Sequence, residues 1–485
     1  MTTPYRPLAG RPTARRAPAL AALACAMLLA ACSTPPAYER PAVDLPAAFK
    51  EGSGLQGQDS GVWQTALPMD SVPDDWWTLF QDETLNTLQR QAAAANQNIA
   101  LSVARLRTAR AAVDSSRAAL MPTLGASAGS TRARAGTGAD GSAQVGTTQS
   151  VGLAAGWELD LWGRLSGGVD AARASAQASA DELAALRLSV AASVAQTYFS
   201  VRAAEAQGQL LRETLDAYQR SWDLTRNRYQ AGVASSADVA QAEAQYKSTQ
   251  AQLIESQISR AQLEHALAAF TGQAPGNFTL PPSAELPTPP LVPAQLPSRL
   301  LERRPDIAAA ERRVAAANAQ IGVARAAFFP DITLSASAGY RGASLGSLFS
   351  ASNLVWSLGP ALAATLFDGG ARAAAVESAR ASLDQAAATY RQTVITALQE
   401  VEDNLVAGAS LEREQAVQVE AVAAAQRALN VVNNQYRAGT VAYLNVLSAQ
   451  AQVLSAQSSL ISVRNRRLAA VTTLLKNVAG RWEAL

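Results

Sequence analysis

The segment from Leu300 to Gly370 constrains the fold most, because its hydrophobic period changes from helical to alternating. A helical spacing of apolar residues follows Pro305 and ends at Phe328. Pro330 stops it, since a residue before proline is disfavoured in the α conformation. Two segments of period two follow, separated by a loop rich in glycine and serine. Their apolar positions are Ile332, Leu334, Ala336, Ala338 and Tyr340, then Leu354, Trp356, Leu358, Leu362, Ala364 and Leu366. One apolar face opposite one small or polar face is typical of membrane barrel strands.

The same helix–hairpin–helix unit occurs earlier in the chain. Arg117–Pro122 matches Arg325–Pro330 at a shift of 208 residues, and Asn227 begins a segment that matches one beginning at Asn434. A nearly constant shift indicates tandem duplication of a unit of roughly 200 residues, not a solenoid of short repeats. We therefore expect two repeats, 82–272 and 298–480, a proline-rich linker at 273–297 and a tail at 481–485. The expected strands lie near 124–135, 147–161, 331–341 and 354–367.

Each repeat also contains a long stretch with few helix breakers. Between Gly168 and Tyr229 there is no proline and one glycine, and apolar residues keep helical spacing. This predicts one helix of roughly 60 residues, about 90 Å long. A second such helix is expected from about Ala371 to Tyr436. Helices of this length indicate a coiled coil or a helical barrel.

Composition argues against several classes of function. The net charge of +2 and the lack of a basic cluster in the mature chain argue against nucleic acid as a partner. His265 is the only histidine, and its mid-helix position favours a surface or partly buried side chain over a catalytic base. The cysteines are Cys25 and Cys32, both near the N-terminus. A His-rich metal site is thus excluded and a His-dependent triad disfavoured. With no nucleotide loop or nucleophile elbow, we expect no enzyme, cofactor or metal.

The N-terminus has the features of a secretory signal. Four arginines precede a short apolar run from Ala19 to Ala31, which is too short to span a bilayer. Residues 1–31 are therefore expected to be a signal peptide, and residues 32–81 an extended arm. Leu29-Ala30-Ala31-Cys32 resembles a bacterial lipoprotein signal, which implies cleavage before Cys32 and its acylation. The alternative is an ordinary signal peptide cut near Ala31. Ser33 in place of aspartate suggests export to the outer membrane.

Together these segments resemble the TolC-like outer membrane efflux family. The resemblance rests on LLERRPDIAAAERRVAAANAQIGVARAAFFPDITL, on the strand end WELDLWGR, on the paired Tyr-X-Ala-Gly turns and on the cysteine. It covers nearly the whole mature chain and is nearest to the NodT-type lipoproteins of resistance-nodulation-division (RND) pumps. It implies a mixed α and β membrane protein, a homotrimer with a 12-stranded outer-membrane barrel continuous with a periplasmic α-helical barrel. Four strands alone cannot close a barrel, and open edges are not tolerated in lipid.

The function that this resemblance implies is a passive exit duct for drugs or other toxic solutes. Its partners would be an inner-membrane RND pump, a periplasmic adaptor and outer-membrane lipid. An alternative is a periplasmic coiled-coil structural lipoprotein without a pore, which would leave the strands unused. The sequence does not identify the solute.

The resemblance also assigns roles to the two turns, Tyr229–Asp238 and Tyr436–Asn445. They would form the periplasmic mouth and meet the adaptor, with Gly232 and Gly439 allowing close approach. Plain helix capping by glycine is the alternative, and both can hold.

The same resemblance implies a gate at this mouth. Tyr436 and Asp238 match the family's gate tyrosine and aspartate, whereas Val441 occupies the arginine position. Asn445 and Ser448 occupy the two carboxylate positions, so we expect an apolar closure by Leu444 and Leu447 instead. A Tyr436–Asp238 contact would be what remains of the network. Alternatively, Asp238 serves a capping box with Ser235.

Overall fold

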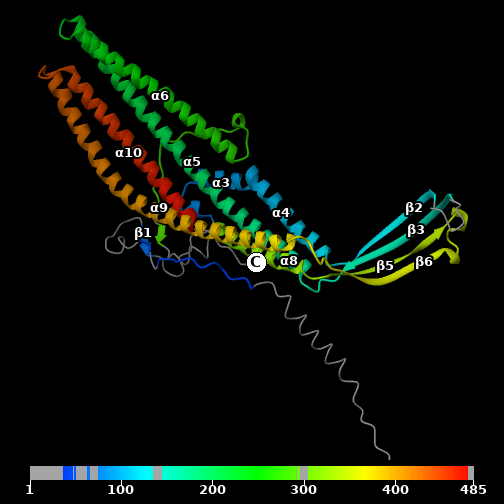
Figure 1. Ribbon diagram of the computed structural model, residues 1–485. Coiled ribbons are helices and arrows are strands. Elements are labelled where there is room, and N and C mark those ends of the chain that lie inside the picture. Colours follow the sequence, from blue (N-terminus) through cyan, green and yellow to red (C-terminus); the bar gives the residue numbers. More distant parts are fainter. Residues whose placement is uncertain are drawn as a thin grey trace, which may run out of the picture. The chain divides into compact units, whose positions relative to one another are not determined.

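The computed structural model describes residues 37–46, 49–50, 63–65, 75–134, 145–290, 292–294 and 304–478. The predicted signal peptide, Cys32 and the tail lie outside the described residues. The helices are α3 (Glu83–Ala95), α4 (Gln97–Ala118), α5 (Arg164–Gln230), α6 (Ser236–Phe270), α8 (Pro305–Ala326), α9 (Ala371–Arg437) and α10 (Tyr443–Val478) (Figure 1). The two long helices predicted from the sequence are confirmed, and both α5 and α9 contain 67 residues.

The chain divides into two compact units, and their boundaries after Arg107, Ala176, Ala310 and Ala388 fall inside helices. The sheet unit consists of residues 37–40, Thr108–Ala176 and Glu311–Ala388, and the helical unit contains the remaining described residues. Each unit therefore draws on both repeats. No helix among the described residues is both long enough and apolar enough to cross a membrane.

The sheet unit contains one antiparallel sheet in the order β2-β3-β5-β6. Its strands are β2 (Thr123–Arg134), β3 (Val145–Glu158), β5 (Asp331–Gly342) and β6 (Leu354–Ala363), which run side by side in Figure 1. The central pair, β3 and β5, joins the first repeat to the second. Gly339 lies against β3 so closely that a Cβ there would overlap the Val151 carbonyl oxygen. The outer edges of β2 and β6 have no strand partner among the described residues.

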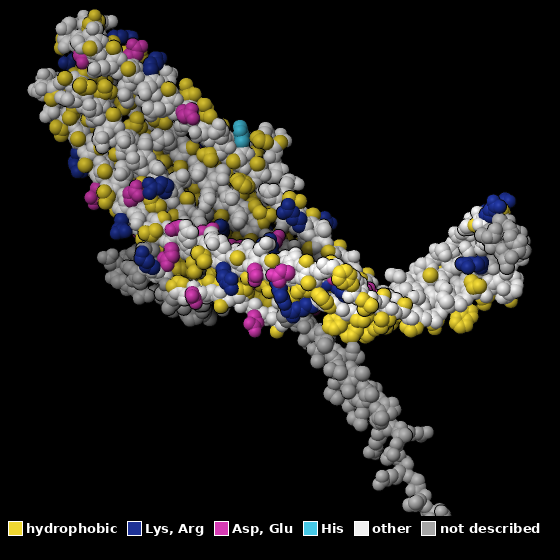
Figure 2. Space-filling view, viewed as in Figure 1, with side chains coloured by type: hydrophobic (Ala, Val, Ile, Leu, Met, Phe, Trp, Pro, Cys, Tyr) yellow, Lys and Arg dark blue, Asp and Glu magenta, His cyan; other side chains and the backbone are white. Residues whose placement is uncertain are grey.

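The register confirms the predicted division of the sheet into two faces. Directly opposed residues of antiparallel strands point to the same face. One such row runs Leu124, Ala155, Ala336, Leu358, and the next runs Gly125, Ala154, Ser337, Ser357. The apolar face is bare, with Trp356 75% and Leu358 66% exposed. Charged side chains are few over the strands (Figure 2).

Two strands end earlier than the sequence pattern suggested. β3 stops at Glu158 because the Asp160 carboxylate accepts hydrogen bonds from the Leu165 and Ser166 amides, at 2.9 and 2.8 Å, and so starts α5. β6 stops at Ala363, which pairs with the first residue of β5. Pro330, just before β5, has no N–H with which to extend the ladder.

The helical unit is held together by buried ion pairs as well as by apolar packing. Arg202 of α5 donates to Glu205 at 2.7 Å and to the Pro281 carbonyl at 2.8 Å. Arg260 of α6 donates to the same Glu205 at 3.1 Å. Each buried charge thus has a partner, as burial in a low dielectric requires. These contacts fix the segment after α6 against α5. The helical unit also contains a short parallel strand pair, β1 (Trp63–Thr65) with β4 (Val292–Ala294).

Candidate functional site

The two helix–turn–helix ends of the helical unit contain the residues singled out by the sequence. We call residues Tyr229–Asp238 the first tip and residues Tyr436–Asn445 the second tip. Gly232 and Gly439 have φ of +75° and +76°. In both tips the backbone forms the paired hydrogen bonds of a Schellman motif. These are Gly232 N to Tyr229 O, Val233 N to Arg228 O, Gly439 N to Tyr436 O and Thr440 N to Gln435 O, at 2.8–3.1 Å.

The capping interpretation of the two glycines is therefore confirmed. A Cβ at either position would meet no atom within 4 Å. Backbone conformation alone, and not lack of space, requires glycine there, because a positive φ is strained for other residues. The proposed contact of these glycines with a partner protein stays a prediction.

Tyr436 lies in an apolar cluster at the second tip. It is 8% exposed and packs with Ala242, Tyr443 and Val446. The rings of Tyr436 and Tyr443 have centroids 5.6 Å apart. Val441 and Leu447 pack against the cluster from its edge. The family resemblance implies an arginine at position 441. The valine found there instead adds apolar contact to the cluster where α9 turns into α10.

A cation covers this cluster from the other repeat. The Arg228 guanidinium lies 4.6 Å from the centre of the Tyr436 ring. Its Nη1 also donates to the Tyr436 carbonyl oxygen at 3.4 Å. The sequence analysis missed Arg228, because nothing local to it indicates a partner 208 residues away. The available signal was the alignment of the two repeats, in which Arg228 matches Gln435, so the copies differ at this position.

Asp238 serves its own helix instead of Tyr436. Its Oδ2 accepts hydrogen bonds from the Ser235 amide at 3.0 Å and hydroxyl at 2.9 Å. The Asp238 amide in turn donates to Ser235 Oγ at 3.1 Å, which completes a capping box. Within the described residues no hydrogen bond joins Tyr436 to Asp238. The expected contact between them is thus replaced by the Arg228–Tyr436 contact.

The residues expected to narrow a channel lie at the start of α10. Leu444 is 53% exposed, and Asn445 and Ser448 are also exposed. Ser448 Oγ donates to the Leu444 carbonyl at 2.9 Å. Leu447 is half-buried against the Tyr436 cluster, so on this chain Leu444 is the one apolar side chain of the expected pair that faces solvent. Their role in closing a pore stays a prediction.

Tyr443 connects the second tip to α5 by a polar contact. Its hydroxyl lies 3.1 Å from Ser221 Oγ. Burial raises the pKa of Tyr443 above its ordinary value, against the opposing effect of this hydrogen bond. The hydroxyl therefore stays neutral at physiological pH. The second tip thus contacts the first repeat through the Arg228 guanidinium, the Ser221–Tyr443 hydroxyl pair and apolar packing with Ala242.

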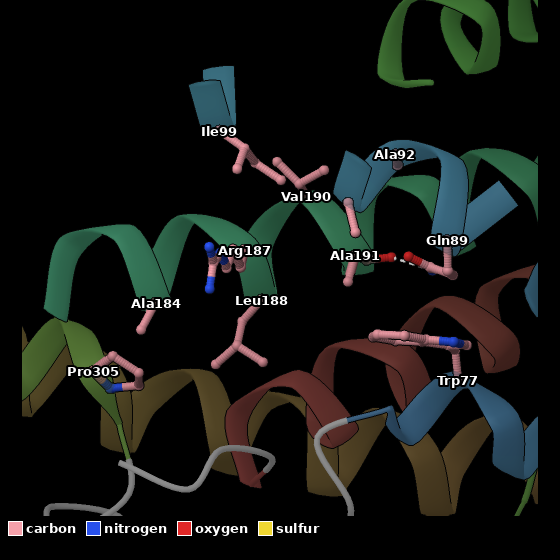
Figure 3. Close-up of a pocket in the computed structure, with 11 residues that line it drawn as sticks. Trp77, Gln89, Ala92, Ile99, Ala184, Arg187, Leu188, Val190, Ala191 and Pro305 are labelled. Carbon is pink, nitrogen blue, oxygen red and sulfur yellow. Dashed lines mark hydrogen bonds between the residues drawn. The ribbon is translucent and has the colours of Figure 1, made fainter. Parts of the chain in front are cut away.

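The helical unit also contains a cavity away from the tips. It has a volume of about 290 Å³ and is lined mainly by apolar side chains, with Gln89 and Arg187 as its polar ones (Figure 3). The Gln89 amide is already bound to the Ala191 carbonyl at 2.8 Å. The lining holds no carboxylate, histidine or thiol for acid–base work. In the described part of the chain no three His, Cys, Asp or Glu residues gather as a metal site.

Comparison of the sequence with known proteins points to transport. Residues 88–273 and 296–480 match the profile of a family described as outer membrane efflux protein. The chain is 31% identical over 456 residues to the probable efflux pump outer membrane protein TtgC of Pseudomonas putida, covering 93% of each protein. It is 33% identical over 457 residues to the outer membrane protein OprJ of Pseudomonas aeruginosa, with 93% of each covered.

Solved structures give the same result for the fold. The outer-membrane channel OprN superposes with a TM-score of 0.84 at 29% identity, over 93% of this chain and 100% of that one. The structure of CusC, described in terms of transmembrane channel formation, gives a TM-score of 0.81 at 28% identity over the same shares. The long helices and the four-stranded sheet are thus those of known outer-membrane channels.

Proposed function

Since the chain belongs to the outer membrane efflux protein family, we propose that it is the exit duct of a tripartite efflux system, assembled as a homotrimer. An inner-membrane RND pump and a periplasmic adaptor would deliver solutes to it. Solute would then cross the outer membrane without any catalytic step. Repeats 82–272 and 298–480 would supply matching halves of each protomer's wall.

The observation that carries this proposal is the four-stranded sheet with two unlike faces and two open edges. The bare apolar face suits lipid, and the glycine- and serine-rich face suits an aqueous bore. Open edges are not tolerated in hydrocarbon, so β2 and β6 must pair with strands of other copies. Three sheets of four strands would close a twelve-stranded barrel, within the range of known barrels. A periplasmic coiled-coil lipoprotein without a pore would have no use for this sheet.

Planar-bilayer recording of the purified protein tests the proposal. We expect discrete conductance steps and, in detergent, a mass three times that of one chain. The apolar face of the edge strand β6 contains Leu358 and Pro360. Leu358→Asp should reduce insertion of the protein into the bilayer, because the new charge would meet lipid. The matched change Ser357→Asp faces the bore and should insert normally. A protein that never conducts would leave the structural lipoprotein as the better account.

We further propose that the tips form the periplasmic mouth and that its closure is apolar. Leu444 would narrow the bore and favour dewetting, and Asn445 and Ser448 would not attract polyvalent cations as rings of aspartate do. Leu444→Ala should therefore raise the resting conductance more than Asn445→Ala. Tight block by a trivalent cation from the periplasmic side, or an unchanged conductance of Leu444→Ala, would count against an apolar gate.

The adaptor contact is assigned to Gly232 and Gly439, where open space surrounds both α-carbons. Gly439→Trp should impair export in cells while trimers still form. Gly439→Ala is the control, because it adds the same backbone strain with little bulk. Equal export by both variants would remove the docking role.

The anchor and the solute complete the proposal. Cys32 would carry acyl chains, and mass spectrometry of the mature N-terminus checks this. An unmodified N-terminus beginning after Cys32 would exclude it. Relatives are named for efflux of antibiotics, toluene and solvents. Small organic solutes are accordingly the first class to test, by growth of a deletion strain with and without the gene.

A further inference from the structure

The apolar face of β2 becomes charged toward one end of the strand. Along this face the residues are Leu124, Ala126, Ala128, Ser130, Arg132 and Arg134. The register keeps both arginines on this face, because Arg132 opposes Thr147 and Arg134 opposes Val145. Arg341 lies at the same end of the sheet but on the other face, since it opposes Ser150. Figure 2 shows dark-blue side chains toward this end of the strands.

The position of the arginines along the strand matches the thickness of a barrel's apolar band. Arg132 is eight residues beyond Leu124, or roughly 27 Å along an extended strand. With the usual tilt of barrel strands this is about 20 Å along the membrane normal, and Arg134 lies about 5 Å farther. The apolar band of such barrels is about 25 Å tall. Both guanidinium groups, which can extend toward water on their aliphatic stems, would therefore lie at headgroup level.

Arg132 and Arg134 have no charge partner within the described residues. Both side chains are exposed, and neither makes a hydrogen bond or ion pair within the described residues. At the opposite end of the sheet, by contrast, Arg164 pairs with Glu158, and Arg372 pairs with Asp368 at 2.6 Å. Residues 135–144 lie outside the described residues and contain one acid, Asp140. Asp140 can neutralise at most one of the two guanidinium groups, so this end of β2 keeps a net positive charge.

We propose that Arg132 and Arg134 bind phosphate groups of lipids in the outer leaflet of the membrane. The inference rests on the proposed barrel, which places this face against lipid. Guanidinium groups bind phosphate through charge-assisted, often bidentate hydrogen bonds, and two of them one pleat apart can hold a doubly phosphorylated headgroup. The contact fixes the depth of the barrel and gives its outer rim a preference for anionic lipid.

The test measures retention of diphosphoryl lipid A by the purified full-length protein in detergent. Arg132→Gln/Arg134→Gln should bind this lipid about tenfold more weakly than the unchanged protein. Arg132→Lys/Arg134→Lys should keep most of the affinity, because the charge is kept. Arg341→Gln is the matched control at the same end of the sheet and should bind normally. Dephosphorylated lipid A should bind weakly to every variant.

Several results would overturn the inference. Equal binding of phosphorylated and dephosphorylated lipid would show that phosphate is not recognised, and equal loss in Arg341→Gln would show that the face is wrong. Displacement of lipid A by excess inorganic phosphate would indicate a free-phosphate site instead of a lipid contact. Conductance is recorded on the same preparations. If the double Gln variant conducts and binds lipid like the original protein, the lipid site is refuted and the barrel is not. If the original protein does not conduct, the barrel itself is refuted.

Discussion

The two tips have the same backbone turn but different side-chain packing. Both end a 67-residue helix with a glycine of positive φ in a Schellman motif. In the first tip, Tyr229 is 49% exposed, whereas its counterpart Tyr436 in the second tip is 8% exposed. The first tip begins its next helix with a capping box on Ser235, and the second begins with Ala442, which has no side-chain oxygen.

The two copies therefore share the backbone turn but differ in the side chains that pack around it. The turn is kept because only glycine accepts its conformation without strain. The side chains around it are free to diverge as long as each buried ring has neighbours. The second repeat supplies Tyr436, Tyr443 and Val446 of the apolar cluster, and Arg228, just before the first tip, supplies the cation over the Tyr436 ring. Four pairs of substitutions can break or sharpen this contrast.

The largest expected effect is on the buried tyrosine. Tyr436→Ala removes a ring from the cluster and should lower the free energy of unfolding of the helical unit by about 3–5 kcal/mol. Tyr229→Ala removes an exposed ring and should cost less than about 0.5 kcal/mol. Denaturant unfolding followed by circular dichroism gives both values. Equal losses would mean that the two tips are packed alike in solution.

The glycines should respond equally. Gly232→Ala and Gly439→Ala each force a positive φ on an L-residue and should each cost about 1–2 kcal/mol. The added methyl group meets open space at both sites, so no clash separates them. The same unfolding experiment applies. A cost at Gly439 several times that at Gly232 would show that packing, and not backbone strain, dominates there.

The cation over the ring should have a smaller effect. Arg228→Ala should destabilise the tips by about 1 kcal/mol, the size expected for a partly exposed cation–π contact. Arg226, two residues earlier and exposed, is the control, and Arg226→Ala should be nearly neutral. A double-mutant cycle with Tyr436→Phe and Tyr436→Ala separates the ring from the hydroxyl. No coupling between positions 228 and 436 would mean that the contact contributes nothing.

The smallest expected effect comes from the pair of changes at the caps. Ser235→Ala removes the capping box and should cost about 1 kcal/mol. Ala442→Ser supplies the second tip with the acceptor that it lacks and should stabilise α10 by a few tenths of a kcal/mol. Amide hydrogen exchange in the first turns of α6 and α10 measures both. Faster exchange after Ala442→Ser would indicate that its serine does not cap.

Local sequence patterns predicted most of the fold and little of the packing at the tips. The period-two pattern identified β3, β5 and β6 clearly and β2 more weakly. The missing prolines identified α5 and α9. The ends of β3 and β6 were misplaced, since Asp160 and Pro330 act through contacts that hydrophobic period does not record. At the tips, the Ser235–Asp238 spacing already indicated a capping box, whereas the Arg228–Tyr436 contact joins distant segments and left no local pattern.

The open edges of β2 and β6 also affect how the protein is made. In the proposed trimer, a newly made chain would carry both edges uncovered until it met other copies, so chain encounter would be part of its folding reaction. The yield should then rise steeply with chain concentration, since association competes with aggregation of exposed strands. Dilution during export would favour degradation over assembly. Synthesis in bursts, or a holding factor that shields strand edges, would favour productive encounters.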